Sequence, residues 1–134
     1  MNIIKRSRAT EIMCSLESCV DIEKVEIEAY FQKLQNLGEI IENHDNFKNM
    51  LDFFYALGNR ERLKIIIALK ENNHCVCELE AILDKSQPSI SHHLRILESV
   101  GLIRSFKKGK FTHYDLVKEE VLSFVDLINQ EFVI

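Results

Sequence analysis

All four cysteines of the chain occur in two close pairs, Cys14 with Cys19 and Cys75 with Cys77. Structural disulfides are uncommon in a reducing cytosol, so close cysteine pairs there more often bind a metal or undergo redox chemistry. Thiolates are soft ligands that select Zn, Cd, Pb, Hg, Cu(I) or trivalent arsenic over Mg or Ca. The two pairs therefore predict a thiophilic metal site or a thiol redox switch, with small buried hydrophobic residues as the simpler alternative.

The composition is typical of one soluble globular domain. The chain has 134 residues, of which 46% are hydrophobic and 28% charged, with one proline and four glycines. Its basic start is not followed by an apolar signal core, and no apolar run is long enough to cross a bilayer. We therefore expect a cytoplasmic protein with no membrane partner, in which residues 1–19 form a flexible arm and residues 20–134 a single domain.

Charge is distributed unevenly along the chain. The net charge is −4, yet residues 85–114 contain six basic side chains and one acidic side chain, a local net charge of +5. The basic residues of this stretch are Lys85, Arg95, Arg104, Lys107, Lys108 and Lys110. A cationic patch on an otherwise acidic protein is the arrangement expected when one face meets a polyanion such as nucleic acid.

An amphipathic helix is predicted over residues 20–43. Its apolar residues recur at steps of three, four or seven, as they do in a coiled-coil seam. They are Val20, Ile27, Tyr30, Leu34, Leu37 and Ile41. An amphipathic helix outside the core domain needs a partner, so we expect this seam to form a dimer interface, with packing onto its own domain as the alternative.

The remaining pattern predicts a mainly α-helical domain with one β-hairpin. Helices are expected over residues 47–57, 60–71, 76–83, 87–100 and 118–132, and strands over 102–106 and 111–116. The apolar positions expected to face the core of the last four helices are Leu63, Ile66, Ile67, Leu69, Val76, Leu79, Ile82, Leu83, Ile90, Leu94, Leu97, Val121, Phe124, Val125, Ile128 and Phe132. A helix-turn-helix followed by a hairpin is the order of a winged helix-turn-helix domain.

The helix over residues 87–100 has a polar face suited to DNA. The predicted contacts on it and at its N-cap are Ser86, Gln87, Ser89, Ser91, His92, His93 and Arg95. These side chains can hydrogen-bond to base edges and phosphates in a major groove. Lys107, Lys108 and Lys110 lie in the hairpin turn, where they can reach neighbouring phosphates. Together these ten residues form the predicted DNA-binding surface.

Three segments resemble those of one known family. They are residues 56–65 (ALGNRERLKI), residues 75–79 (CVCEL), and residues 86–97 (SQPSISHHLRIL) followed by Gly-Leu-Ile at 101–103. In this order they are similar to the opening, metal-sensing and recognition-helix motifs of the ArsR/SmtB winged-helix repressors. The resemblance covers residues 46–128. It implies a homodimer, with the terminal helices at the interface, that binds a palindromic operator and leaves it when a thiophilic metal or metalloid binds.

The resemblance also implies a ligand set for that metal. Cadmium- and lead-type members of the family add thiolates from an N-terminal arm, which points to Cys14, Cys19, Cys75 and Cys77 as an S3 or S4 site, within one subunit or across the dimer. Arsenic-type members usually have a third cysteine where this chain has Glu80. The effector therefore stays open among Cd, Pb, Zn and trivalent As, and no organic cofactor is expected.

Histidines are not among the predicted metal ligands. The family has a second metal site on its last helix, but residues 118–134 contain no histidine, so we expect that site to be absent. His74 is interpreted as a surface residue, with a role as an alternative metal ligand left open, and His113 as part of the wing.

Two other functions remain open. One is a winged-helix regulator that responds to cysteine oxidation, since a helix N-terminus can lower a thiol pKa. The other is a dimeric interaction module that does not bind DNA. We do not expect an enzyme, because the sequence has no Gly-rich phosphate loop or nucleophile elbow, and a four-thiolate metal site has no open position for substrate.

Overall fold

The computed structural model describes residues 7–20, 23 and 26–133. The chain divides into two compact units, residues 1–44 and 45–134. The predicted domain of residues 20–134 spans both units, and its boundary at residue 19 stays a prediction. In the part of the chain that the structure describes, no helix is both long and apolar enough to cross a membrane.

In its described residues, the first unit has two helices that pack on one another, α1 (Arg8–Cys19) and α2 (Ile27–Glu42). The Ser7 hydroxyl caps α1 by accepting a hydrogen bond from the backbone N–H of Thr10 at 3.3 Å. The sequence analysis predicted no helix here, because residues 8–19 show little apolar periodicity.

The predicted seam helix begins later than expected. It starts at Ile27, whereas Val20 is the C-cap of α1 in an extended conformation. Residues 21–22 and 24–25 of the predicted helix lie outside the described residues. Ile27 is buried, but Leu37 and Ile41 are at least half exposed, so the far half of the seam is uncovered in the single chain.

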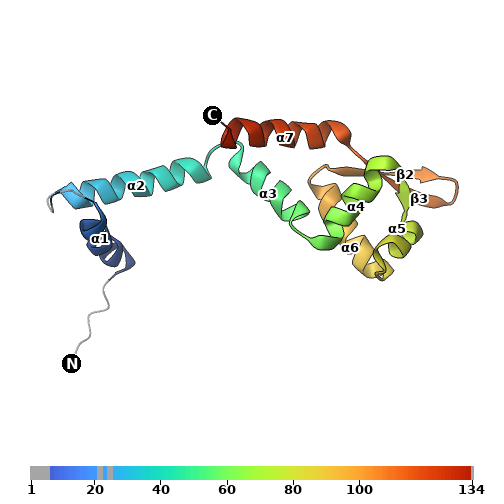
Figure 1. Ribbon diagram of the computed structural model, residues 1–134, viewed down its shortest axis with the longest axis horizontal. Helices are drawn as coiled ribbons and strands as arrows, with labels where there is room; N and C mark the ends of the chain where they lie inside the picture. Colours follow the sequence, from blue (N-terminus) through green and yellow to red (C-terminus); the bar gives the residue numbers. More distant parts are fainter. Residues whose placement is uncertain (1–6, 21–22, 24–25, 134) are drawn as a thin grey trace, which may run out of the picture. The chain divides into compact units, whose positions relative to one another are not determined.

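The second unit contains five helices and three short strands (Figure 1). In chain order they are α3 (Phe47–Leu57), α4 (Arg60–Glu71), β1 (His74–Cys75), α5 (Val76–Leu83), α6 (Gln87–Ser99), β2 (Ile103–Lys108), β3 (Phe111–Leu116) and α7 (Lys118–Phe132). The hairpin of β2 and β3 extends away from the helices as a wing (Figure 1). This is the mainly α-helical winged helix-turn-helix that the sequence predicted.

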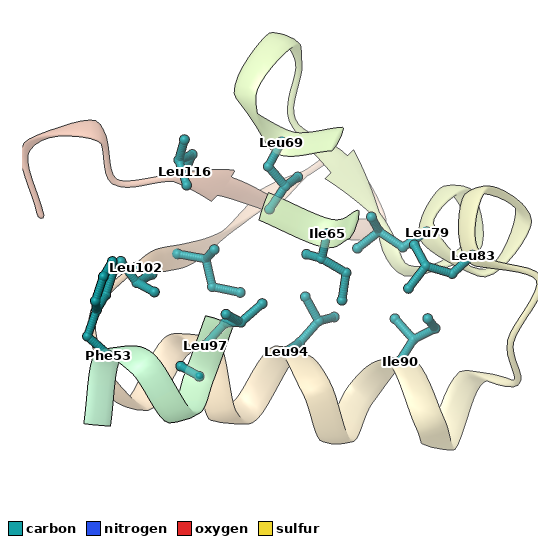
Figure 2. Close-up of a cluster of buried hydrophobic side chains, with 12 residues drawn as sticks. Phe53, Ile65, Leu69, Leu79, Leu83, Ile90, Leu94, Leu97, Leu102 and Leu116 are labelled. Carbon is teal, nitrogen blue, oxygen red and sulfur yellow. The ribbon is translucent and has the colours of Figure 1, made fainter. Parts of the chain in front are cut away.

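The core of this unit lies where α4 and α5 meet α6. Ile90, Leu94 and Leu97 project from one face of α6 at steps of four and three residues, and each is at most 1% exposed (Figure 2). They pack against buried side chains of α4, α5 and the sheet, among them Ile65, Leu69, Leu79, Leu83, Leu102 and Leu116. Buried side chains of α5 and α6 therefore belong to one core.

The sheet is antiparallel with strand order β1-β3-β2. The register of the first pair places His74 opposite Tyr114 and Cys75 opposite His113. The sequence analysis did not predict β1, since two residues are too few for a periodic pattern. This strand attaches the start of α5 to the wing.

Two tight turns frame α6. Asp84, between α5 and α6, is the one non-glycine with positive φ among the described residues, at 53°. Aspartate tolerates this left-handed conformation better than most residues, so the turn of the helix-turn-helix can be short. Gly101 follows the end of α6 and has a φ of 78°. A residue with a side chain would be strained in this left-handed conformation.

For several helices, some of the residues predicted to face the core are exposed instead. On α4 the buried residues are Arg62, Ile65 and Leu69, whereas Leu63 and Ile67 are 46% and 60% exposed. This helix has apolar residues on several sides, so local periodicity did not single out the face that tertiary packing selects. Ile82 of α5 is also exposed. On α7 no residue is buried: Val121, Phe124 and Ile128 pack partly against the core, and Val125 and Phe132 are exposed.

Candidate metal centre and nucleic-acid interface

The four cysteines lie at the starts or on the surfaces of helices. Cys14 and Cys19 are both exposed on α1, in the first unit. Cys75 is the N-cap of α5 and half-buried, and Cys77 is exposed in the first turn of the same helix. The predicted four-thiolate set thus draws one pair from each unit.

A different group of potential metal ligands converges around Cys75. Among the described residues, one ligand atom each of Cys75, Glu78 and His113 lies within 4.8 Å of the other two. Cys75 and His113 face one another across β1 and β3, and Glu78 stands in the first turn of α5. The set contains one thiol, one carboxylate and one imidazole.

The carboxylate of Glu78 is held by two neighbours. Its Oε1 accepts a hydrogen bond from the backbone N–H of Cys75 at 3.1 Å, and its Oε2 lies 3.1 Å from His74 Nδ1. These hydrogen bonds, the backbone one foremost, lower the pKa of Glu78 to about 2. The group is therefore an anion throughout the physiological range. His74, interpreted from the sequence as a surface residue, is paired with this carboxylate.

Sequence reasoning missed both Glu78 and His113 as members of such a group. Glu78 was read only as part of a family motif, and His113 only as part of the wing. The helix break at residues 72–73 leaves two residues, 74–75, before α5 begins. This gap was the sign in the sequence that a short strand could lie there. Only the register of β1 on β3 brings His113 to Cys75.

The predicted DNA-binding surface is largely exposed. Ser86, Gln87, His92 and Arg95 are exposed on α6 and its N-cap, and Ser89 and Ser91 are half-buried. Pro88 occupies the first turn of α6, where its missing N–H costs no hydrogen bond. The remaining N–H groups of this turn point along the helix axis and favour a bound anion.

The wing carries the other predicted contacts. Lys107 and Lys108 belong to the end of β2, and Lys110 to the turn with Gly109 that joins β2 to β3. All three lysines are exposed, and Lys107 Nζ donates to Thr112 Oγ1 at 2.8 Å. The wing is therefore a cationic projection beside α6.

His93 differs from its neighbours on α6. Its side chain is half-buried, and its Nδ1 lies 3.1 Å from an Nη1 donor of the buried Arg62. Burial, and then the charge of Arg62, lowers the pKa of His93 below its usual range. The ring acts as the acceptor of a cation's hydrogen bond, which only neutral imidazole can do.

We predict that His93 makes the protein less stable in mild acid. Because its folded-state pKa lies below the unfolded value of about 6.5, its contribution to stability is complete above about pH 6.5 and is lost as the pH falls through the lower, folded-state pKa. Urea unfolding at about pH 7.5 and about pH 5.5 measures the loss. His93→Gln, whose amide oxygen can still accept from Arg62, is expected to lose less stability than the unsubstituted protein. The exposed His92→Gln is the matched control, and equal losses in all three proteins would contradict the prediction.

The comparisons with known proteins agree with this architecture. Residues 59–105 match the family model described as "Bacterial regulatory protein, arsR family". The chain is 30% identical over 94 residues to the "Transcriptional repressor SmtB homolog" of Synechocystis sp., which covers 70% of this chain and 71% of that one. The chain belongs to the ArsR/SmtB family. As a family member it is a transcriptional regulator with a winged-helix DNA-binding fold.

Two further similar proteins are informative. The "Cadmium resistance transcriptional regulatory protein CadC" of Listeria innocua is 38% identical over 76 residues, or 56% of this chain and 64% of that one. Among solved structures, HlyU from Vibrio cholerae is 29% identical with a TM-score of 0.56, covering 66% of this chain and 97% of that chain. These likenesses support the fold and a regulatory role for this family member.

Proposed function

We propose that this ArsR/SmtB-family regulator is a homodimeric repressor that leaves a palindromic operator when a thiophilic ion binds Cys14, Cys19, Cys75 and Cys77. The observation that carries the proposal is the position of Cys75 and Cys77 at the start of α5, the helix that packs directly on α6.

The DNA-binding half of the proposal rests on α6 and the wing. The exposed polar side chains of α6 have the reach and hydrogen-bonding groups needed in a major groove, and its first turn favours a phosphate. Lys107, Lys108 and Lys110 add phosphate contacts from the wing. Two copies related by a dyad would read two half-sites about one helical turn apart, which is the reason to expect a palindrome.

The metal-sensing half rests on ligand chemistry. Four thiolates favour soft ions, so Cd, Pb, Zn and trivalent As are the candidates. A relative named for cadmium resistance supports this class of effector. Cys14 and Cys19 are both exposed and lie on the same helix, α1.

The shared core of α5 and α6 gives a route from metal to DNA. Leu79 and Leu83 of α5 belong to the same buried cluster as Ile90 and Leu94 of α6. A metal bound by Cys75 and Cys77 pulls on the start of α5, and α6 has to follow because the core is close-packed. A coupling free energy of about 1–3 kcal/mol between metal and DNA is typical of such regulators.

The dimer is supported by apolar side chains that one copy leaves uncovered. In the second unit the neighbouring helices α3 and α7 carry six of them, Leu51, Phe54, Tyr55, Leu122, Val125 and Phe132. Exposed apolar residues gathered on neighbouring helices mark an interaction surface. We assign this surface to a second copy of the chain, since two-fold pairing of the winged-helix unit also matches a palindromic operator.

The test uses the reduced protein and a random-sequence duplex pool, from which the protein selects its own site. We expect the selected duplexes to contain an inverted repeat, and Cd(II) to weaken binding to them by about 5- to 150-fold, measured by fluorescence anisotropy. Mg(II) is the metal control, because thiolates do not select it. Cys14→Ser and Cys19→Ser are expected to reduce the response to Cd(II) while leaving affinity for DNA in its absence unchanged.

Three results would overturn the proposal. If the protein selects no DNA sequence from the pool, the chain is an interaction module rather than a repressor. A response to peroxide with none to Cd(II) would make it a redox regulator. A full Cd(II) response in both arm variants would remove Cys14 and Cys19 from the site.

A further inference from the structure

We propose that Cys75, Glu78 and His113 form a mixed-ligand site for a borderline divalent cation of the Zn(II) type, which links the start of α5 to the wing. The inference goes beyond the proposed function, because it requires neither Cys14 and Cys19 nor release from DNA. It rests on the convergence of three ligand types from two segments that are far apart in the sequence.

The sheet sets the first two ligands against each other. Cys75 and His113 are directly opposed in the antiparallel pair of β1 and β3. Side chains at opposed positions of such a pair lie on the same face, with Cβ atoms about 4.5–5.5 Å apart. A thiolate and an imidazole in this relation can share one ion without any movement of the backbone.

The first turn of α5 supplies the third ligand. Cys75 is the N-cap and Glu78 the third residue of the helix, in a capping-box arrangement that bends the carboxylate back over Cys75. The ligand atoms lie within 4.8 Å of one another. Around tetrahedral zinc they would be about 3.3–3.6 Å apart, as the usual Zn–S, Zn–N and Zn–O bond lengths require. A bound ion would therefore draw the three ligand atoms closer to one another.

Neighbouring residues orient two of these ligands. His113 Nδ1 lies 2.9 Å from Asn73 Oδ1, an acceptor, so Nδ1 carries the hydrogen and Nε2 keeps the lone pair that a metal needs. His74 Nδ1 pairs with Oε2 of Glu78. Partners of this kind, which fix the tautomer of a histidine and hold a ligating carboxylate, are a regular feature of metal sites.

The ligand set selects the ion. A thiolate and a carboxylate together neutralise a dication, and the imidazole completes three protein ligands of a tetrahedral site with a fourth position for water. Oxygen-preferring Mg and Ca do not suit a thiolate and an imidazole, whereas Zn(II) accepts all three donor types. Cd and Pb, the softer ions of the proposed function, favour sulfur, whereas Zn(II) suits both ligand sets, so the sites differ in ligands and in the range of ions they accept.

The test is a titration of the reduced full-length chain with Co(II), a spectroscopic substitute for Zn(II). We expect thiolate-to-cobalt charge-transfer absorption and visible bands of tetrahedral intensity. Glu78→Gln retains the capping hydrogen bond but loses the anionic ligand, and His113→Ala loses the imidazole. Each is expected to weaken Co(II) binding at least tenfold. Circular dichroism of both variants checks that the fold is kept.

Matched variants separate this site from the four-thiolate one. In the triple variant Cys14→Ser, Cys19→Ser and Cys77→Ser the four-thiolate site is removed, and we expect a Co(II) spectrum with one thiolate ligand to remain. Loss of that remaining spectrum in the triple variant, or its survival when Glu78→Gln and His113→Ala are added, overturns the mixed-ligand site. The mixed-ligand site can be tested separately from the proposed function. If the Co(II) spectrum depends on His113 but Cd(II) does not release the protein from DNA, the mixed-ligand site is upheld and the proposed sensing mechanism fails.

Discussion

Cys75→Ser is expected to weaken binding of both Cd(II) and Co(II) by at least about 100-fold, because Cys75 is the one ligand that the two proposed sites share. The substitution changes the ligand without disturbing the fold. Cys75 is the N-cap of α5 with extended φ and ψ, and serine is among the best residues at that position. Serine therefore removes the soft thiolate and keeps, or slightly improves, the start of the helix.

The measurement is competition of each metal with a chelating dye, together with the urea midpoint of the metal-free variant. Cys77→Ser is the matched control, since it changes an exposed thiol in the same turn of α5. It should impair Cd(II) binding and leave the Co(II) site of Cys75, Glu78 and His113 in place. If Cys75→Ser binds both metals with unchanged affinity, Cys75 is a ligand in neither site. If its urea midpoint is lowered, the role of Cys75 is structural.

Arg62→Met is expected to destabilise the protein by about 2–4 kcal/mol. Arg62 is 5% exposed, and its Nε and Nη2 donate to the carbonyls of Ala56 and Tyr55 at 2.6 and 3.0 Å. These carbonyls lie in the last turn of α3, which has no intrahelical donors for them. The cation also stabilises the negative end of the helix dipole. Methionine fills similar volume but leaves buried acceptors unsatisfied, at about 1–3 kcal/mol each.

The control for this substitution is Arg60→Met, which changes an exposed arginine at the start of the same helix. We expect its free energy of unfolding to stay within about 0.5 kcal/mol of that of the unsubstituted protein. Chemical denaturation at neutral pH measures both variants. Equal stability of the two would mean that Arg62 can be replaced by any side chain of its size.

The sequence predicted the elements of the second unit better than their faces. The bounds of α4, α5 and α7 were correct because caps and breaks mark them locally, as Asn59 does when its side chain accepts from two N–H groups of α4. The buried face of α4 was wrong because Arg62 turns inward to the carbonyls of α3. That contact joins residues of two helices, and the periodicity of one helix does not contain it.

For the candidate site, too, the sequence indicated some residues and missed a contact that depends on the fold. The cysteine pairs and the polar face of α6 are visible in the sequence because their residue types are unusual at such spacings. The approach of His113 to Cys75 depends on a two-residue strand and its register. Nothing in the residues around His113 sets it apart from an ordinary wing histidine, so sequence reasoning could not find this pair.

The cationic wing has a consequence for how the molecule approaches DNA. Lys107, Lys108 and Lys110 project from a unit whose remaining surface carries many acidic side chains, such as Glu119 and Glu120 at the start of α7. Opposite charges at separate places on one body give it a dipole, and the field of a polyanion turns such a body before contact. The wing therefore leads the encounter, and α6 arrives already oriented towards the groove.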